Sequence, residues 1–282
     1  MLNIEFYKSS GFFGYKELQK GDIVFNEGDI DKNLYIIISG KLVIEKYTSI
    51  EKKEKKELAL LSAENFFGEA SLDIYDINKP KENSVVAKEN SLLLFINGDK
   101  GIENFINKHP IEGLNLLRHI ISITNKRLLS SNKLITVNHE VVKSIMQIEN
   151  INEKNIFMVI DKIKLITGYD YILFLEANPV VNNYYTLKYD TREKGKLKDD
   201  IIEKDLILSL KGFDNWVLSN NNYIQKLNIG SLDLGFMIFG KNSLFTYDDK
   251  RLIISIGNSL TGLLKQKEIL KDDLNRSYMK NV

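Results

Sequence analysis

Residues 66–87 of the chain read FFGEASLDIYDINKPKENSVVA. The stretch contains a Gly-Glu pair at Gly68 and Glu69, a short apolar turn, a Pro-Lys step ending at Lys81, and the start of a strand at Ser84. Gly68 has no Cβ and lets the backbone approach a ligand closely, and backbone N–H groups after Glu69 are placed to face a phosphate. Glu69 can accept hydrogen bonds from sugar hydroxyls, and Lys81 supplies a positive charge. The stretch therefore predicts an anion-binding cradle between two β-strands.

The same residues resemble the phosphate-binding cassette of cyclic nucleotide-binding domains. In that family Phe-Gly-Glu is followed by a short helix, a Pro-Arg step, two small residues, Ser or Thr, and a strand. Here Phe67-Gly68-Glu69 and residues 80–87 (PKENSVVA) take these places. Residues 21–29 (GDIVFNEGD) and 34–44 (LYIIISGKLVI) resemble the strands that precede the cassette. The resemblance implies a jelly roll that binds cyclic AMP or cyclic GMP.

The resemblance also implies a role for each end of the cassette. We expect Glu69 to hold the ribose 2′-hydroxyl, and Lys81, with the backbone of Gly68 and Ala70, to hold the cyclic phosphate. The predicted ligand-binding residues are Phe67, Gly68, Glu69, Ala70, Ser71, Lys81, Glu82, Asn83 and Ser84.

The cassette departs from the family pattern in three ways, and these keep alternatives open. Lys81 stands where the family has arginine and lacks the planar fork that binds phosphate oxygens in pairs. Glu82 stands where a small residue is usual and brings a carboxylate close to the phosphate. The segment before Lys81 is a few residues longer than usual, which leaves Lys79 as another candidate cation. The alternatives are a site for a different anion, or a ligand-free scaffold for dimerisation or docking.

Composition sets broad limits. A chain of 282 residues suits two domains, and 43% hydrophobic with 27% charged residues is ordinary for globular proteins. The net charge of +1 gives no electrostatic reason to expect nucleic acid. No cysteine is present, which excludes disulfides and thiolate chemistry and fits a reducing compartment. The N-terminus does not resemble a signal peptide and no window approaches the ~20 apolar residues of a membrane span. We expect a cytoplasmic protein without membrane contact.

Short apolar runs separated by Gly, Asn and Asp turns between residues 23 and 96 predict the strands of a jelly roll. Residues 1–18 are predicted as a short helical lead-in, and residues 50–57 (IEKKEKKE) as an exposed hairpin tip. From Gly101 the apolar spacing becomes helical. The stripe on this long helix either forms a homodimer seam or packs back on its own sandwich. Its residues are Ile102, Phe105, Ile106, Leu114, Leu117, Ile121 and Leu128.

A second module is expected after residues 129–138, which are predicted as a linker or a continuous helical bridge. Helical periodicity covers residues 141–148 and 156–166, strand patterns cover 171–175, 184–189 and 234–239, and further helices are expected from 201 and 246. The close of the module, LGFMIFG at 234–240 and LFTYDDKRLI at 244–253, resembles the end of a GAF domain. Thr246 is a suitable N-cap with acids in the following turn. The resemblance covers roughly residues 139–270.

The sequence does not decide whether the second module contains a ligand pocket. No cysteine is available for a covalent bilin, and the three histidines, which could serve as haem ligands, lie before the module or at its edge. Four aromatic residues either line a pocket or belong to the core: Phe174, Tyr185, Trp216 and Tyr223. No ligand is predicted for this module.

Enzyme and DNA-binding classes find little support in the sequence. A metal centre in a jelly roll needs clustered histidines on strands, but His109 and His119 are expected on the helix and His139 near the linker. P-loop, zinc-helix and Ser-His-Asp patterns are absent. The C-terminal residues 265–282 form one predicted helix rather than a helix-turn-helix, and the net charge gives no basic footprint. We expect no enzyme activity, no metal and no cofactor.

The predicted fold class is α+β in two domains. Residues 1–135 are predicted as a jelly roll with a long C-terminal helix, and residues 136–282 as a GAF-like sheet flanked by helices. The resemblance implies a cytoplasmic signalling sensor in which a cyclic nucleotide moves the long helix. The expected partners are the nucleotide, a second copy through the long helix, and an unidentified protein; DNA and membranes are not expected.

Overall fold

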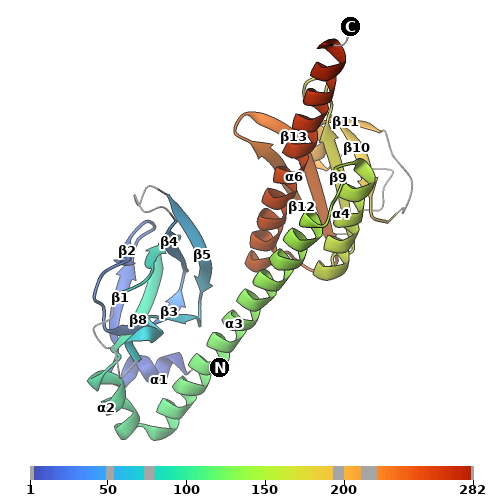
Figure 1. The fold of residues 1–282 in the computed structure, drawn as a ribbon. Coiled ribbons are helices and arrows are strands. Elements are labelled where there is room, and N and C mark those ends of the chain that lie inside the picture. Colours follow the sequence, from blue (N-terminus) through green and yellow to red (C-terminus); the bar gives the residue numbers. More distant parts are fainter. Residues whose placement is uncertain (1–2, 49–53, 73–79, 193–199, 211–220, 281–282) are drawn as a thin grey trace. The chain divides into compact units, whose positions relative to one another are not determined.

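The computed structural model describes residues 3–48, 54–72, 80–192, 200–210 and 221–280. Its contacts separate two units, Met1–Leu129 and Ser130–Val282 (Figure 1). Helix α3, Pro110–Met146, runs across this division as one element. Residues 129–138 therefore form a continuous helical bridge, and the boundary expected after residue 135 lies inside the same helix. None of the described helices is long and apolar enough to cross a membrane.

Two antiparallel four-stranded sheets form the first unit, with strand orders β1-β8-β3-β6 and β2-β7-β4-β5. This is the jelly-roll-like arrangement that the turn-punctuated apolar runs predict. The strands are β1 Gly14–Leu18, β2 Ile23–Phe25, β3 Asn33–Ser39, β4 Lys41–Tyr47, β5 Lys55–Ser62, β6 Phe66–Phe67, β7 Ser84–Ala87 and β8 Ser91–Asn97.

Strand β3 explains why the first unit has two layers of core. Successive side chains of a strand point to opposite faces, and four consecutive residues of β3, Leu34 to Ile37, are buried. Tyr35 and Ile37 pack in the cluster between the two sheets, while Leu34 and Ile36 pack in a second cluster that also contains residues of the helices. The apolar run at 34–38 is thus a strand with both faces covered.

The helices of the first unit are α1 Ile4–Ser9, α2 Lys100–Lys108 and the beginning of α3. Buried Phe105 of α2 lies at the centre of an aromatic cluster with Tyr7 and Phe13. Helix α3 contributes Leu116 and Ile120 to the same core.

The apolar stripe is divided between buried and exposed residues of α3, and two other expectations for this unit need correction. The buried face of α3 is made by Leu116 and Ile120, whereas Leu114, Ile121 and Leu128 of the predicted stripe are 48%, 59% and 57% exposed. The two faces lie at similar helical spacings, so periodicity alone did not separate them. Residues 14–18 form β1 instead of continuing a helix, because they pair with β8. Strand β5 begins at Lys55, inside the expected hairpin tip, whose residues 50–53 lie outside the described part.

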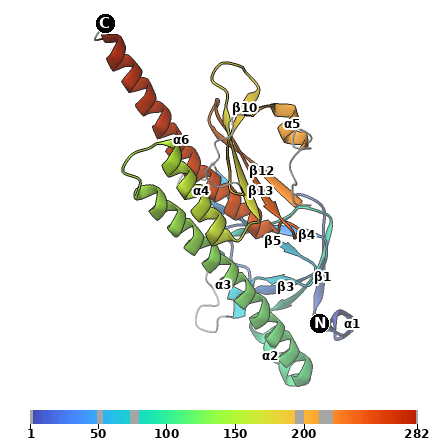
Figure 2. The same cartoon turned by 90° about the vertical axis from the view of Figure 1, so that its right-hand side faces the viewer.

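The second unit is built on a five-stranded sheet of order β11-β10-β9-β13-β12. Figure 2 shows α4 and α6 on one face of this sheet and α5 on the other. The elements are α4 Glu153–Thr167, β9 Tyr171–Ala177, β10 Tyr184–Asp190, β11 Ile201–Glu203, α5 Lys204–Ser209, β12 Asn221–Ile229, β13 Leu232–Lys241 and α6 Tyr247–Lys280.

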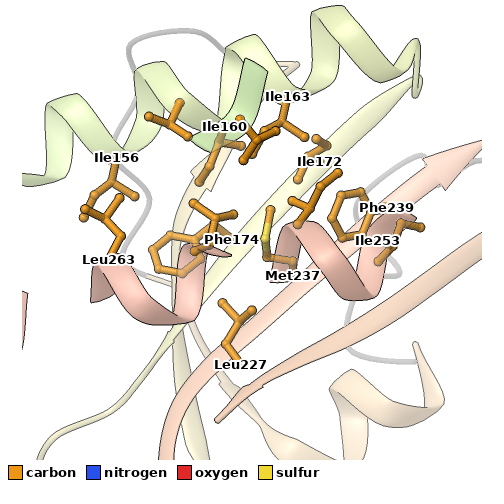
Figure 3. Close-up of a cluster of buried hydrophobic side chains, with 14 of the residues drawn as sticks. Ile156, Ile160, Ile163, Ile172, Phe174, Leu227, Met237, Phe239, Ile253 and Leu263 are labelled. Atoms are coloured by element: carbon orange, nitrogen blue, oxygen red, sulfur yellow. The ribbon is translucent and has the colours of Figure 1, made fainter. Parts of the chain in front are cut away.

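Both faces of the central strand β9 are buried. Ile172 and Phe174 meet the helices α4 and α6 together with Met237 and Phe239 of β13 (Figure 3). Leu173 and its alternate neighbours pack on the opposite face with residues of β10, β11 and α5. The continuous apolar run of β9 follows from this double coverage.

The structure confirms some of the predicted elements of the second unit and corrects others. The helix at 156–166 and the three predicted strands are confirmed. The helix expected from Ile201 is wrong at its start, because residues 201–203 pair with β10 and bury Ile202 before α5 begins at Lys204. Strand β12 was not predicted.

The aromatic residues considered for a pocket in this unit belong to its cores. Phe174 and Tyr185 are buried in the two core clusters, and Tyr223 is partly buried against one of them. Trp216 lies outside the described residues.

Candidate functional site

The cassette residues surround a cavity of about 330 Å³ in the first unit. Every predicted site residue except Ser84 lines it, and the strands and loop around the cassette complete the wall. The lining residues are Phe25, Asp31, Ile44, Phe67, Gly68, Glu69, Ala70, Ser71, Pro80, Lys81, Glu82, Asn83 and Val85. The fold thus brings together two segments that lie on either side of residues 73–79, which are outside the described part and include Lys79.

Gly68 makes the turn from β6 into the cavity wall. Its φ of +83° lies in the left-handed region, and a Cβ at this position would lie 2.3 Å from the carbonyl oxygen of Asn33. Glycine is therefore required here on both conformational and steric grounds. The turn continues into a short 3-10 helix, η1 Glu69–Leu72, in which the backbone N–H of Ser71 donates to the Gly68 carbonyl at 2.9 Å.

Lys81 places a buried ammonium at the cavity. Its backbone is fixed by hydrogen bonds to Asp29 and Gly28, at 2.8 and 2.7 Å. The residue is only 8% exposed, and Nζ lies 5.2 Å from the centre of the Phe25 ring. Burial lowers the pKa of Lys81, while the negative charges of Asp31 and Glu69 act in the opposite direction. Within the described residues Lys81 forms no ion pair, so an anion entering the cavity would meet ammonium donors that are available to it.

Glu69 is joined to helix α3 by Arg127. The Arg127 guanidinium bonds Glu69 Oε1 at 3.3 Å and the carbonyl oxygen of Phe66, and lies 4.8 Å from the centre of the Phe66 ring. Burial lowers the pKa of Arg127, and Glu69 opposes that shift. One carboxylate oxygen of Glu69 is held by this contact, which leaves Oε2 for a ligand hydroxyl.

Sequence reasoning missed Arg127, although the spacing contains a signal for it. Leu116, Ile120, Ile123 and Arg127 follow one another at steps of four, three and four, which places them on one face of an α-helix. When an arginine lies on the buried apolar face of a helix, its guanidinium needs hydrogen-bond acceptors. These acceptors must come from the part of the protein that packs against that face.

Asp31 is a charged residue of the cavity wall that the sequence did not predict. The backbone N–H of Asn33 donates to Oδ1 at 2.9 Å and the Tyr35 hydroxyl donates to Oδ2 at 2.8 Å. Burial raises the pKa of Tyr35, so this hydroxyl remains a donor. The Tyr35 ring stacks on Phe67 at 4.9 Å between centroids. Asp31 is thus a carboxylate held in a fixed place beside the cassette.

Two residues at the end of the cassette differ in what they do. Ser84 was predicted as a site residue but does not line the cavity. Its Oγ accepts the backbone N–H of Glu27 at 3.0 Å, so this buried side chain holds the β2–β3 loop in place. Asn83 lines the cavity, and its Oδ1 is buried without a hydrogen-bond partner among the described residues.

A comparison with protein-family models matches residues 15–109 to the family described as "Cyclic nucleotide-binding domain". Residues 15–109 are a cyclic nucleotide-binding domain. The resemblance seen in the cassette and in the strands before it is therefore confirmed for this part of the chain. The match ends before α3 begins.

Solved structures of related folds were also found. The N-terminal domain of a transcriptional regulator from Streptomyces coelicolor A3(2) is 22% identical, with a TM-score of 0.36 over 44% of this chain and 84% of that chain. A cyclic nucleotide-binding domain from Methylobacillus flagellatus KT is 20% identical, with a TM-score of 0.39 over 46% and 70%. The c-di-GMP responsive global regulator CLP of Xanthomonas campestris is 20% identical, with a TM-score of 0.43 over 51% and 68%. Their ligands and roles are properties of those proteins.

The described residues contain no group of three or more His, Asp or Glu side chains arranged to hold a metal ion. His119 and His139 lie on α3, and His109 lies between α2 and α3. His119 Nε2 is 2.7 Å from the carbonyl oxygen of Glu64.

Proposed function

We propose that this protein is a signalling sensor that binds cyclic AMP or cyclic GMP in the cavity of its jelly roll. The observation that carries the proposal is the buried Lys81 ammonium at a cavity of about 330 Å³, which Glu69 also lines. A volume of this size lies in the range of small-molecule sites. The cyclic phosphate binds at Lys81 and the ribose 2′-hydroxyl donates to Glu69.

The signal leaves the cavity through Arg127. Because Arg127 belongs to α3 and bonds Glu69, a ligand that changes the position or charge environment of Glu69 alters a contact of α3. Binding then shifts the population of α3 positions. In this proposal the second unit is a GAF-like module that receives the change and passes it to a protein partner in the cytoplasm, with no catalytic, DNA-binding or membrane role.

The active form in this proposal is a homodimer through α3. Leu114, Ile121 and Leu128 are spaced by seven residues and are roughly half exposed. A seven-residue apolar repeat is the pattern of a two-stranded coiled coil. The repeat continues at Ile135 and Val142, which are 66% and 39% exposed in the later part of α3.

A ligand-free scaffold is the second candidate, and the charges of the cavity favour it. Among the described lining residues, Asp31, Glu69 and Glu82 set three carboxylates against one ammonium, that of Lys81. Such a lining opposes anions. In this case the jelly roll serves only dimerisation or docking.

Calorimetric titration of the purified protein with cyclic AMP and cyclic GMP, together with a thermal shift, tests the proposal. We expect saturable binding and a raised melting temperature. Glu69→Ala should abolish binding with the fold retained, whereas Glu103→Ala, which removes an exposed carboxylate of α2, should change nothing. No heat and no shift up to millimolar nucleotide would overturn the proposal.

A double variant separates a weakened site from a lost one. Lys81→Arg combined with Glu82→Ala restores the planar fork and removes one carboxylate of the lining. A sensor with a weak site should gain affinity sharply, whereas a scaffold should remain silent in the titration.

A further inference from the structure

Asp31 is positioned in the cavity more firmly than its other carboxylates. Both of its oxygens accept a hydrogen bond, one from the Asn33 N–H and one from the Tyr35 hydroxyl. Tyr35 is itself buried at 3% exposure and stacked on Phe67. The side chain cannot turn away from the cavity without losing two hydrogen bonds.

The other two acids of the lining act differently. Glu69 lies 3.3 Å from the guanidinium of Arg127, which offsets its charge. Glu82 is exposed, so solvent and salt screen it. Asp31 is half-buried and influences the Lys81 ammonium electrostatically, yet forms no ion pair with it in the described structure. Asp31 is therefore the negative charge that an anion bound at Lys81 would feel most strongly.

We propose that Asp31 sets the charge class of the ligand, so that the cavity accepts singly charged phosphodiesters and rejects doubly charged phosphomonoesters. The inference rests on the proposed function. One ammonium can neutralise one phosphate charge inside the cavity. A second charge would face the fixed carboxylate, and the cost of removing an anion from water rises steeply with its charge. A cyclic nucleotide would thus be retained and its 5′-monophosphate hydrolysis product excluded.

The test compares how one substitution changes the affinities of two ligands. Cyclic AMP and 5′-AMP are titrated at pH 7.5, where the monoester carries nearly two charges and the cyclic diester one. The full-length protein is used as wild type, Asp31→Asn and Glu103→Gln. Glu103 of α2 is exposed and does not line the cavity, so its substitution removes the same charge elsewhere.

We expect Asp31→Asn to narrow the affinity ratio of cyclic AMP to 5′-AMP by about tenfold, because relief of repulsion grows with the ligand charge. Glu103→Gln should leave the ratio unchanged. The two ligands also differ in shape, but this difference affects wild type and variant alike. It therefore cancels when the affinity ratio of the variant is compared with that of the wild type. Thermal unfolding of each variant identifies any loss of fold.

The outcomes separate the two proposals. In one outcome cyclic AMP binds, but Asp31→Asn changes the affinities for cyclic AMP and 5′-AMP equally or lowers only the melting temperature. Asp31 then only supports the β2–β3 loop. This result overturns the inference, while the proposed function stands. If neither wild type nor Asp31→Asn binds cyclic AMP or cyclic GMP, the proposed function fails and the inference fails with it.

Discussion

At the scale of single residues, Lys81 shows how a residue that suits a binding site can lower the stability of the fold. Its ammonium is buried and, among the described residues, forms no ion pair. Keeping an ammonium away from water costs free energy unless it is fully paired. The residue is therefore better explained by an anion that visits the cavity than by a contribution to folding.

Lys81→Met tests this directly, since methionine is unbranched and apolar and fits the buried stem. We expect cyclic nucleotide affinity to fall at least a hundredfold, while the free energy of unfolding stays the same or rises by about 1 kcal/mol. Calorimetry and urea denaturation measure the two quantities. A large loss of stability would show that Lys81 is a structural residue.

The same variant should remove a pH dependence. Burial lowers the pKa of Lys81 below its ordinary value of 10.5. Between the folded and the unfolded pKa the unfolded chain binds more protons, so the stability of the wild type should rise with pH in that window. Lys81→Met should lack this rise. Denaturation midpoints measured at pH 8 to 10.5 compare the two proteins.

At the scale of elements, Arg127 connects the cassette to α3. Arg127→Lys keeps the charge but cannot bond Glu69 and the Phe66 carbonyl with one planar group. We expect it to lower the free energy of unfolding by about 1–2 kcal/mol and to weaken cyclic nucleotide binding several-fold. Arg118→Lys, at an exposed position of the same helix, is the matched control. Equal behaviour of the two variants would contradict the role of Arg127.

The start of α6 is stabilised by a reciprocal cap. The Asp249 N–H donates to Thr246 Oγ1 at 3.1 Å, and Asp249 Oδ2 accepts from the Thr246 N–H at 2.9 Å and from Lys241 at 2.8 Å. Thr246 thus caps the helix as predicted. Burial by itself would raise the pKa of Asp249, but the hydrogen bonds and the charge of Lys241 outweigh it and hold the pKa below 3.8.

Asp249→Asn should lower the free energy of unfolding by about 1–2 kcal/mol at pH 7. A lowered carboxyl pKa contributes stability above the unfolded value of 3.8 and loses it as pH falls through that value toward the folded pKa. The difference between wild type and variant should therefore shrink on acidification. Urea denaturation from pH 7 to pH 3.5 measures it. Asp170→Asn, at an exposed position, should show no such trend.

At the scale of the whole molecule, the exposed repeat of α3 predicts self-association. Ile121→Lys together with Leu128→Lys places charges at two positions of the repeat, and like charges facing each other across a coiled coil oppose pairing. We expect the wild type to have the mass of a dimer in light scattering, and the variant that of a monomer. Leu165→Lys changes an 83% exposed residue of α4 outside the repeat and should leave the mass unchanged. A variant that keeps the wild-type mass would exclude this seam.

The second unit has its own sheet with two buried faces, one under α4 and α6 and one under α5. Its GAF-like character stays a prediction, since the family match ends at residue 109. Of the aromatic residues considered for a pocket, Phe174, Tyr185 and Tyr223 contribute to the cores instead.

The sequence by itself determined the cassette, the jelly-roll strands, the long helix and the cap at Thr246. Each of these is encoded locally. Gly68 is required by its own φ, strands follow from apolar runs between turn residues, and a cap depends on residues three apart.

Only the tertiary structure decided which side chains form the cavity wall. Asp31 from a loop and Lys81 from the cassette line one cavity with Glu69 only after the sheets have packed, and Arg127 reaches Glu69 only after α3 has packed. Ser84 lies inside the motif yet faces away, because strand side chains alternate between faces. Periodicity predicts that a face is apolar, but whether it is covered depends on what packs against it.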